Sequence, residues 1–270
     1  MQEFSVSMCV YGKDNAVHFK LAVDSILNQT VRPSEIVLVV DGPVPDELNG
    51  IIEYYKETPI FKVIRLEKNQ GHGIARRIGL ENCTYDLVAL MDADDISLQN
   101  RFEIQLEMFK NNPELDIVGG NETVFMDDPN EIIGKKNVFE NDKEIKSCMK
   151  RLCPMNQVTV MFKKNSVQSV GGYQDWYCNE DYYLWIRMAL AEMKFANVPE
   201  VLVNVRFGNG QSSRRGSLKY FVSGAKLQWF MFQKKIISFP RFIYNTALRF
   251  CFQVLMTNRM RSLVTKMLRK

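Results

Sequence analysis

Acidic residues are absent from the last 70 positions of this 270-residue chain, which nevertheless hold 14 lysines and arginines. All 31 acidic residues lie in the first 200 positions beside 21 basic ones, so the net charge of +4 combines −10 before residue 201 with +14 after it. A basic segment without acids favours an anionic partner such as phosphate, a lipid surface or nucleic acid. Because the segment contains no recognisable nucleic-acid-binding module, we expect no nucleic-acid partner.

Histidine and paired cysteine are also scarce. Two histidines and six scattered cysteines without CxxC spacing exclude a His-rich or zinc-ribbon metal site and a disulfide framework. The first residues show no secretory leader, so we expect a reduced chain in the cytoplasm. No uncharged apolar run reaches the about 18 residues that cross a membrane. With 46% hydrophobic and 24% charged residues, the chain is expected to form one large globular domain with an appendage.

Apolar periodicity predicts alternating strands and helices in the first half of the chain. The expected strands are Phe4 to Tyr11, Glu35 to Asp41, Phe61 to Leu66, Leu87 to Asp92 and Leu115 to Asn121. The helices between them are centred on Phe19 to Leu27, Leu48 to Tyr55, Gly71 to Asn82 and a segment that Ser97 would cap and Pro113 would end. This alternation predicts an α/β fold with a parallel sheet.

The second half of the chain is more mixed. We expect a hairpin with Pro129 and Asn130 in its turn, strands at Val158 to Phe162 and Val201 to Phe207, and a helix at Asn179 to Met193. Three basic amphipathic helices are predicted beyond it, at Leu218 to Gln233, Phe242 to Met256 and Arg259 to Arg269.

Acidic side chains follow two of the predicted buried strands. Asp41 ends one strand, and the run Asp92-Ala93-Asp94-Asp95 follows the apolar LVALM. Ligands of parallel α/β sheets bind beyond the carboxyl ends of the strands, so these acids should mark the functional edge. Carboxylates two residues apart can share a hard cation such as Mg²⁺ or Mn²⁺, which would bind a diphosphate. Capping the next helix would require only one acid, whereas three follow this strand. We therefore favour the metal interpretation.

Three further features allow two interpretations each. Glu180-Asp181 at a predicted helix start can supply a general base or simply cap the helix. Asp41, before Gly42 and Pro43, can bind a base or ribose or belong to a turn. Basic side chains beside glycine-rich segments can bind phosphate or lie in solvent: Arg76 and Arg77 after Gly71-His72-Gly73, and Arg206, Arg214 and Arg215 near Ser212 and Ser213.

Together these segments resemble glycosyltransferase family 2 enzymes of GT-A fold, of the type that builds bacterial exopolysaccharide and lipopolysaccharide. The resemblance rests on SVSMCVYGKDN, VLVVDGPV, NQGHGIARRIGLENCTYDLVALMDADDISLQNRFEIQ and NEDYYLWIRMA, supported by MNQVTVMFKKNSVQSVGGY and SSRRGSLKY. It implies a Rossmann-like nucleotide-diphospho-sugar transferase with a mixed sheet and a C-terminal helical extension. We expect a catalytic domain at 1–220, with a nucleotide-sugar half at 1–121 and an acceptor half at 122–220, followed by the extension at 221–270.

The resemblance also implies a reaction and roles for individual residues. It implies an inverting transfer, by single displacement, from a UDP-sugar to a hydroxyl of a glycan or polyprenyl-diphosphate-linked acceptor. Asp181 would be the base, Asp92 and Asp94 would bind Mn²⁺ or Mg²⁺, and Glu180, Gln157 and Trp185 would lie on the acceptor side. The residues expected at the nucleotide sugar are Val10, Tyr11, Asp41, Asn69, Gly71, Arg76, Asp92, Ala93, Arg214 and Arg215.

Alternatives remain open for the activity and for the tail. A DxD phosphatase would carry its motif in the first strand rather than the fourth, and a non-catalytic nucleotide-sugar-binding relative would not need both Asp94 and Asp181. The segment from Phe239 to Met256 is rich in aromatic and aliphatic residues, interrupted by Arg241 and Arg249. It either lies peripherally on the inner face of the cell membrane or packs on the catalytic domain.

Overall fold

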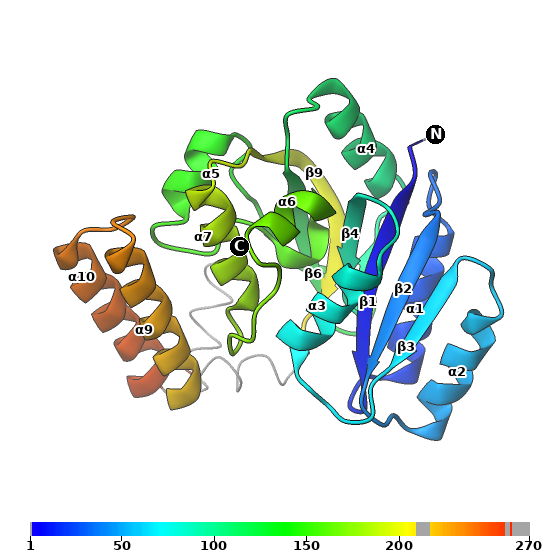
Figure 1. Cartoon of the computed structure of the whole chain (residues 1–270). Coiled ribbons are helices and arrows are strands. Elements are labelled where there is room, and N and C mark those ends of the chain that lie inside the picture. Colours follow the sequence, from blue (N-terminus) through cyan, green and yellow to red (C-terminus); the bar gives the residue numbers. More distant parts are fainter. Residues whose placement is uncertain (1, 209–216, 257–259, 261–270) are drawn as a thin grey trace.

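The computed structural model describes residues 2–208, 217–256 and 260, and a nine-stranded mixed sheet forms its centre (Figure 1). The strands, in chain order, are β1 (Phe4–Tyr11), β2 (Glu35–Asp41), β3 (Phe61–Arg65), β4 (Leu87–Met91), β5 (Ile96–Ser97), β6 (Ile117–Phe125), β7 (Ile132–Lys136), β8 (Met161–Lys163) and β9 (Phe195–Arg206). Their order across the sheet is β3-β2-β1-β4-β8-β6-β9-β5, and β7 pairs with β6.

The predicted alternation of strands and helices is confirmed for the first half of the chain. Strands β3, β2, β1 and β4 are parallel neighbours, whereas β8 runs antiparallel to β4 and to β6. The helices are α1 (Ala16–Leu27), α2 (Asp46–Lys56), α3 (His72–Asn82), α4 (Arg101–Asn111), α5 (Asp142–Cys148), α6 (Lys164–Ser169), α7 (Glu180–Leu190), α9 (Leu218–Gln233) and α10 (Phe239–Phe250), with a 3₁₀ turn η1 (Gln157–Thr159) and a π turn η2 (Cys251–Leu255).

Several predicted boundaries were wrong. Ser97 does not cap a helix; it lies in β5, and α4 begins at Arg101. The expected strand at Val158 begins as the turn η1 and becomes extended only at Met161. Strand β9 starts at Phe195, six residues before the expected Val201, because it pairs along the whole of β6. The apolar pattern located these elements, but the pairing partners that fix their ends lie far away in the sequence.

Two hydrophobic clusters cover the two faces of the sheet. Alternate residues of β4 enter each cluster, with Ala89 and Met91 on one side and Val88 and Leu90 on the other. Helices α1, α2 and α4 fill the first cluster, and α3, α5, α6, α7 and α9 fill the second. A strand that is buried on both faces needs a continuous apolar sequence, which explains LVALM.

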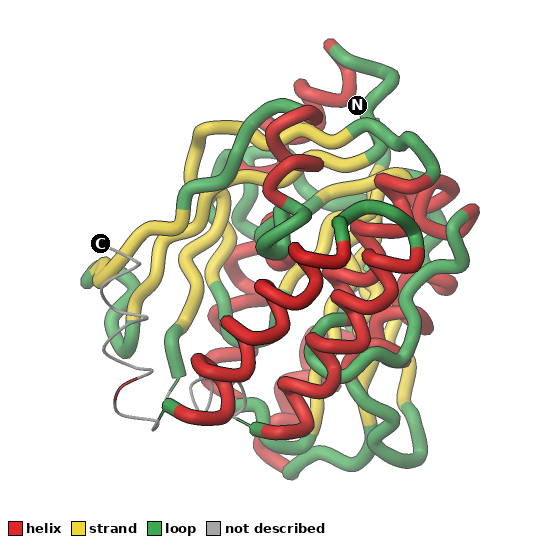
Figure 2. Tube along the Cα trace, turned by 90° about the vertical axis from the view of Figure 1, so that its left-hand side faces the viewer, coloured by secondary structure: helices red, strands yellow, loops and turns green. Residues whose placement is uncertain are grey.

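The C-terminal helices form an antiparallel pair on the second face (Figures 1 and 2). Leu227 and Met231 of α9 are fully buried in the second cluster, and α10 packs on α9. Helix α9 has the predicted bounds, and α10 begins at Phe239 rather than Phe242, with Pro240 in its first turn. No helix of residues 2–208, 217–256 and 260 has the length and apolarity needed to cross a membrane. Apart from Met260, the third predicted tail helix lies outside the described residues.

A buried polar pair joins α4 to the strands β4 and β6 and to the end of the η1 turn. Arg101 and Gln105 are both fully buried. The Arg101 guanidinium donates to the carbonyl oxygens of Leu90 at 2.8 Å and Val160 at 3.3 Å, and its Nε donates to Gln105 Oε1 at 3.1 Å. Gln105 in turn donates to the carbonyls of Val118 and Thr159. The pair therefore fixes the carboxyl end of β4, from which the acidic run emerges.

We predict that Arg101→Leu destabilises the fold by about 2–4 kcal/mol, because Gln105 and the two carbonyls lose their shared donor inside the core. Urea unfolding measures the change. Lys110→Leu, at the exposed end of the same helix, is the control and should shift stability by about 0.5 kcal/mol or less. Equal or greater stability of Arg101→Leu would mean that the desolvation of the buried cation outweighs its contacts.

Candidate active site

The predicted donor residues gather at the carboxyl edge of the parallel strands. Tyr11 ends β1 beside Asp41 at the end of β2, and Asp92 follows β4 directly. Val10 and Ala93 are buried, whereas Tyr11 is 37% exposed at the sheet edge. This edge is where parallel α/β sheets bind ligands.

The Asp41 carboxylate organises the loop that leads into α3. Its oxygens accept hydrogen bonds from the backbone N–H groups of Gln70 at 2.7 Å and Gly71 at 3.0 Å. Asn69 Nδ2 donates to the backbone carbonyl oxygen of Asp41. Gly71 has a φ of 91°, which a side chain would strain. Asp41 therefore positions the start of α3, and with it Arg76, in addition to any contact it makes with a nucleotide.

Arg76 connects the Asp92-Ala93-Asp94-Asp95 run to the Glu180-Asp181 pair. Its guanidinium is buried and donates to Asp92 Oδ1 at 2.8 Å and to Glu180 Oε1 at 3.3 Å. Burial alone would lower the pKa of Arg76, but Asp92 and Glu180 raise it above its ordinary value. Residues separated by 104 positions in the sequence thus meet around one cation, which explains why this predicted phosphate-binding arginine is buried.

The other two acids of the DADD run have different environments. Asp95 is buried, and its Oδ1 accepts a hydrogen bond from the backbone N–H of Arg206 at 2.8 Å. Burial, followed by the charges of Asp94 and Asp92, raises the pKa of Asp95 well above its usual range. Asp94 is half-buried, and its carbonyl oxygen accepts from Arg206 Nε at 3.1 Å. Asp95 therefore anchors the motif, while Asp92 and Asp94 remain accessible.

The donor set at Asp92 and Asp94 fits a cation that is shared with a substrate. Within the described ranges, no three His, Cys, Asp or Glu side chains are gathered to hold a metal by themselves. Mg²⁺ in phosphate-transfer sites is held by one or two carboxylates, and substrate phosphates and water supply the other ligands. Two partly accessible carboxylates at a sheet edge match that arrangement, whereas a structural metal centre would need a more complete set.

The first turn of α7 carries Glu180 and Asp181 in different settings. Glu180 is buried, and burial together with the charge of Asp181 raises its pKa to about 7, against the opposing effect of Arg76. Asp181 is half-buried; its Oδ1 accepts from the Tyr182 N–H at 2.7 Å, and its Oδ2 accepts from Cys153 Sγ at 3.7 Å. The more accessible Asp181 is the better placed of the two to receive a proton from a bound molecule.

The two other predicted acceptor-side residues differ in burial. Gln157 is half-buried, and its Nε2 donates to the hydroxyl of Tyr173 at 2.9 Å. Trp185 is fully buried in the second cluster, with its ring 6.3 Å from that of Phe162. The structure thus places Trp185 in the packing behind the site rather than on an open surface. Arg214 and Arg215 lie outside the described residues.

Glycine allows α3 to approach the acceptor-side segment. A Cβ on Gly73 would lie 2.8 Å from the carbonyl oxygen of Gln174 and 3.5 Å from the Cα of Asp175. His72, one residue earlier, has its Nδ1 3.5 Å from Glu180 Oε1. The donor-side loop and the segment before α7 are therefore in direct contact.

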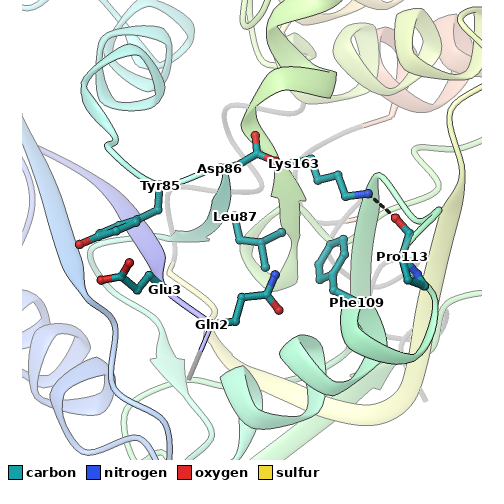
Figure 3. Close-up of a pocket in the computed structure, with 8 residues that line it drawn as sticks. All are labelled: Gln2, Glu3, Tyr85, Asp86, Leu87, Phe109, Pro113 and Lys163. Carbon is teal, nitrogen blue, oxygen red and sulfur yellow. Dashed lines mark hydrogen bonds between the residues drawn. The ribbon is translucent and has the colours of Figure 1, made fainter.

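A cavity of about 370 Å³ lies elsewhere, beside the amino ends of β1 and β4 (Figure 3). Gln2, Glu3, Tyr85 and Asp86 contribute to its wall, and Lys163 there donates to the carbonyl oxygen of Pro113. Because the predicted site residues gather at the carboxyl edge, this cavity is separate from the candidate site.

Comparison with known proteins decides the family. The model of glycosyl transferase family 2 matches residues 5–170. A UDP-Gal:alpha-D-GlcNAc-diphosphoundecaprenol beta-1,3-galactosyltransferase of Escherichia coli is 34% identical over 271 residues, which cover 99% of this chain and 97% of that protein. The chain belongs to glycosyltransferase family 2. It is therefore an enzyme, and the phosphatase and non-catalytic alternatives are set aside.

Solved structures confirm the GT-A fold of this family 2 glycosyltransferase. TarS 1–349 of S. aureus in complex with UDP-GlcNAc has a TM-score of 0.70 at 14% identity, covering 93% of this chain and 73% of that one. The mannosyltransferase PcManGT of Pyrobaculum calidifontis in complex with GDP-Man and Mn²⁺ has a TM-score of 0.62 at 15% identity, covering 98% and 73%. The same fold thus accepts different nucleotides.

The contacts of this glycosyltransferase site include residues that sequence analysis left without a role. Cys153 donates a hydrogen bond to Asp181, and Tyr173 accepts one from Gln157. Arg206 donates hydrogen bonds to Asp94 and Asp95. For Arg206 the sequence left two alternatives, a diphosphate contact or an exposed basic loop, and the structure instead buries it against the DADD run. Cys153 and Tyr173 had no signal in spacing, because both lie outside the helices and strands and their partners in α7 and η1 are 28 and 16 residues away.

The raised pKa of Glu180 predicts a pH-dependent stability difference. Glu180 favours its protonated form in the folded state, so its contribution is fully present below the ordinary pKa of 4.5 and is lost as the pH rises through about 7. Glu180→Gln should therefore gain about 2–3 kcal/mol relative to the wild type between these limits. Urea unfolding in EDTA across this range measures the gain. Glu47→Gln, in the first turn of α2, is the control, and a pH-independent difference for Glu180→Gln would contradict the assignment.

Proposed function

We propose that this glycosyltransferase transfers a sugar, with inversion, from a UDP-sugar to a hydroxyl of a polyprenyl-diphosphate-linked glycan in the synthesis of a cell-surface polysaccharide. The observation that carries the proposal is the Arg76 bridge, which joins Asp92, the first acid of the DxD motif after β4, to Glu180 beside Asp181. A donor-binding edge and a base then share one site. The Escherichia coli relative, named for UDP-Gal and a diphosphoundecaprenol-linked acceptor, supports this donor and acceptor class.

The donor would bind over the edge formed by β1, β2 and β4. Val10, Tyr11, Asp41, Asn69 and Gly71 would surround the nucleoside, with Asp92 and Ala93 beside the ribose and diphosphate. Arg76 and, from the segment outside the described residues, Arg214 and Arg215 would offset phosphate charge. Asp92 and Asp94 would hold Mn²⁺ or Mg²⁺, and a cation bound there would stabilise negative charge on the departing diphosphate.

Asp181 would act as the base of a single displacement. Its carboxylate takes the proton of the acceptor hydroxyl as that oxygen forms a bond to the anomeric carbon, and the bond from that carbon to the diphosphate oxygen breaks on the opposite face. The Tyr182 N–H and the Cys153 thiol hold the two carboxylate oxygens in place. Burial, and then the charge of Asp181, raises the pKa of Cys153 well above its ordinary value, so the thiol keeps the proton that it donates.

The acceptor would approach from the side of α7 and η1. Glu180 and Gln157 would line that side, and Trp185 would support it from the core. We propose 1–121 as the nucleotide-sugar half, 122–220 as the acceptor half and 221–270 as the extension. Position 121 lies within β6, so the two halves share one sheet. A membrane-held acceptor would place the enzyme at the cytoplasmic face of the cell membrane.

We predict metal-dependent release of UDP from one member of a panel of UDP-sugars, tested alongside GDP-mannose. Asp94→Ala should abolish this release, because it removes a carboxylate that would hold the cation. EDTA should abolish the release by wild type, and excess Mn²⁺ should restore it. The donor site would be contradicted if UDP bound wild type equally tightly with and without metal, and if Asp94→Ala bound UDP as tightly as wild type.

We predict that Asp181→Asn lowers kcat by about 10²–10⁴-fold once an acceptor is supplied, because the base is lost while the donor site stays intact. Product formation with a polyprenyl-diphosphate-linked sugar measures kcat, and UDP binding should be unchanged. Asp46→Asn, an exposed acid in the first turn of α2, is the matched control. A kcat within about twofold of wild type would remove Asp181 from the role of base.

A further inference from the structure

Helix α10 turns its apolar face outward. Phe239, Ile243, Tyr244 and Leu248 lie on one side of the helix and are 50–59% exposed. The side that packs against the protein includes Phe242, but its one fully covered residue is polar: Asn245 is buried and donates to the carbonyl oxygen of Lys150 at 3.0 Å and to Gln228 Oε1 at 2.8 Å. A surface helix of a globular protein normally shows the opposite arrangement, with apolar residues inward and polar residues outward.

The exposed apolar face continues into an aromatic group at the α9–α10 turn. The rings of Trp229 and Phe242 are 5.5 Å apart, and those of Phe232 and Phe239 are also 5.5 Å apart. Trp229 is 46% exposed. Helix α10 lies at the outer edge of the molecule, away from the sheet (Figure 1). A contiguous exposed apolar face of this kind marks a contact with a partner or a membrane.

A basic cavity borders this face. It measures about 350 Å³ and lies between the end of α5 and the α9–α10 turn. Lys150, Arg151 and Arg241 contribute cations to its wall, and Ser147 and Ser238 contribute hydroxyl groups. Within the part of the chain that the structure describes, none of the three cations forms an ion pair with a carboxylate. Arg241 lies in α10 itself, next to the apolar face.

We propose that the outward face of α10 and the Lys150–Arg151–Arg241 cavity together form a docking surface for an anionic lipid bilayer. The apolar side chains enter the boundary between headgroups and acyl chains, and the cavity receives a lipid phosphate. A second copy of this chain fits less well, because it would bring an equally basic, acid-free segment to the same face. The inference rests on the proposed function, because docking would bring the enzyme to a lipid-linked acceptor in the membrane.

The docking surface is joined to the acceptor side of the catalytic site. Asn179, directly before Glu180, donates from Nδ2 to Ser223 Oγ of α9 at 3.0 Å. The Trp176 indole N–H donates to the Ser223 carbonyl oxygen at 3.2 Å. Helix α9 therefore connects the start of α7 to the helix that would lie on the lipid, so a docked enzyme would hold Asp181 in a fixed relation to the bilayer.

Co-sedimentation of the full chain with vesicles tests the proposal. Wild type should bind vesicles of phosphatidylcholine containing phosphatidylglycerol and bind pure phosphatidylcholine vesicles much more weakly. The cavity variant Lys150→Gln/Arg151→Gln/Arg241→Gln should lose at least about tenfold in binding, since each basic group near an anionic leaflet contributes about fivefold to partitioning. Lys20→Gln/Lys56→Gln/Lys110→Gln, on α1, α2 and α4, removes the same charge elsewhere and should bind like wild type.

A second pair of variants isolates the apolar contribution. Ile243→Ser/Leu248→Ser should also lose at least about tenfold in binding, whereas Val17→Ser/Leu21→Ser, at similarly exposed positions of α1, should not. Unchanged vesicle binding by both the cavity and the α10 variants would overturn the proposal. So would a wild-type dimer that Ile243→Ser/Leu248→Ser dissociates, because a second copy would then cover the face. Transfer to a detergent-dispersed acceptor should survive in all these variants, and its absence in wild type would count against the proposed function alone.

Discussion

The position of Arg76 between two acid clusters is the constraint on which the site depends. A buried guanidinium is costly unless carboxylates surround it, and here Asp92 and Glu180 do so from different parts of the chain. The contact holds the end of β4 and the start of α7 at a fixed separation. Asp41 contributes indirectly, because its bonds to Gln70 and Gly71 set the beginning of the helix that carries Arg76. A phosphate that arrived beside Arg76 would compete with these carboxylates for the same donors.

The donor half of the fold could be predicted from sequence because its signals are local. Each parallel strand is a short, mostly apolar run, two of these strands lead into an acid, and parallel pairing then brings Tyr11, Asp41 and Asp92 to one edge. The acceptor half was less predictable. Strand β8 has only three residues, and β9 extends beyond its apolar core because β6 pairs with it. Trp185 illustrates the limit at the site: its neighbours in sequence suggested the acceptor side, while tertiary packing buries it completely.

The charge asymmetry of the sequence corresponds to two different regions of the structure. The acids of the first 200 residues include those that gather around Arg76 and Arg206, where each has a defined partner. The acid-free end forms α9 and α10, whose outward surface combines aromatic and aliphatic side chains with cations. Composition alone left packing and lipid contact as alternatives. The structure shows packing for α9 and for the side of α10 that carries Phe242 and Asn245, and leaves the other side of α10 uncovered by the described residues.

The pairing of β9 has a consequence for hybrid enzymes. This strand pairs with β5, which lies between the DxD motif and α4, and with β6 along its length. Its last residue, Arg206, also bonds to Asp94 and Asp95. A segment exchange that imports an acceptor region from a relative would therefore carry a strand that completes the donor motif. Modular recombination at position 121 would cut through a shared scaffold, so donor and acceptor preferences in this architecture should be inherited together unless β5, β6 and β9 are exchanged as one unit.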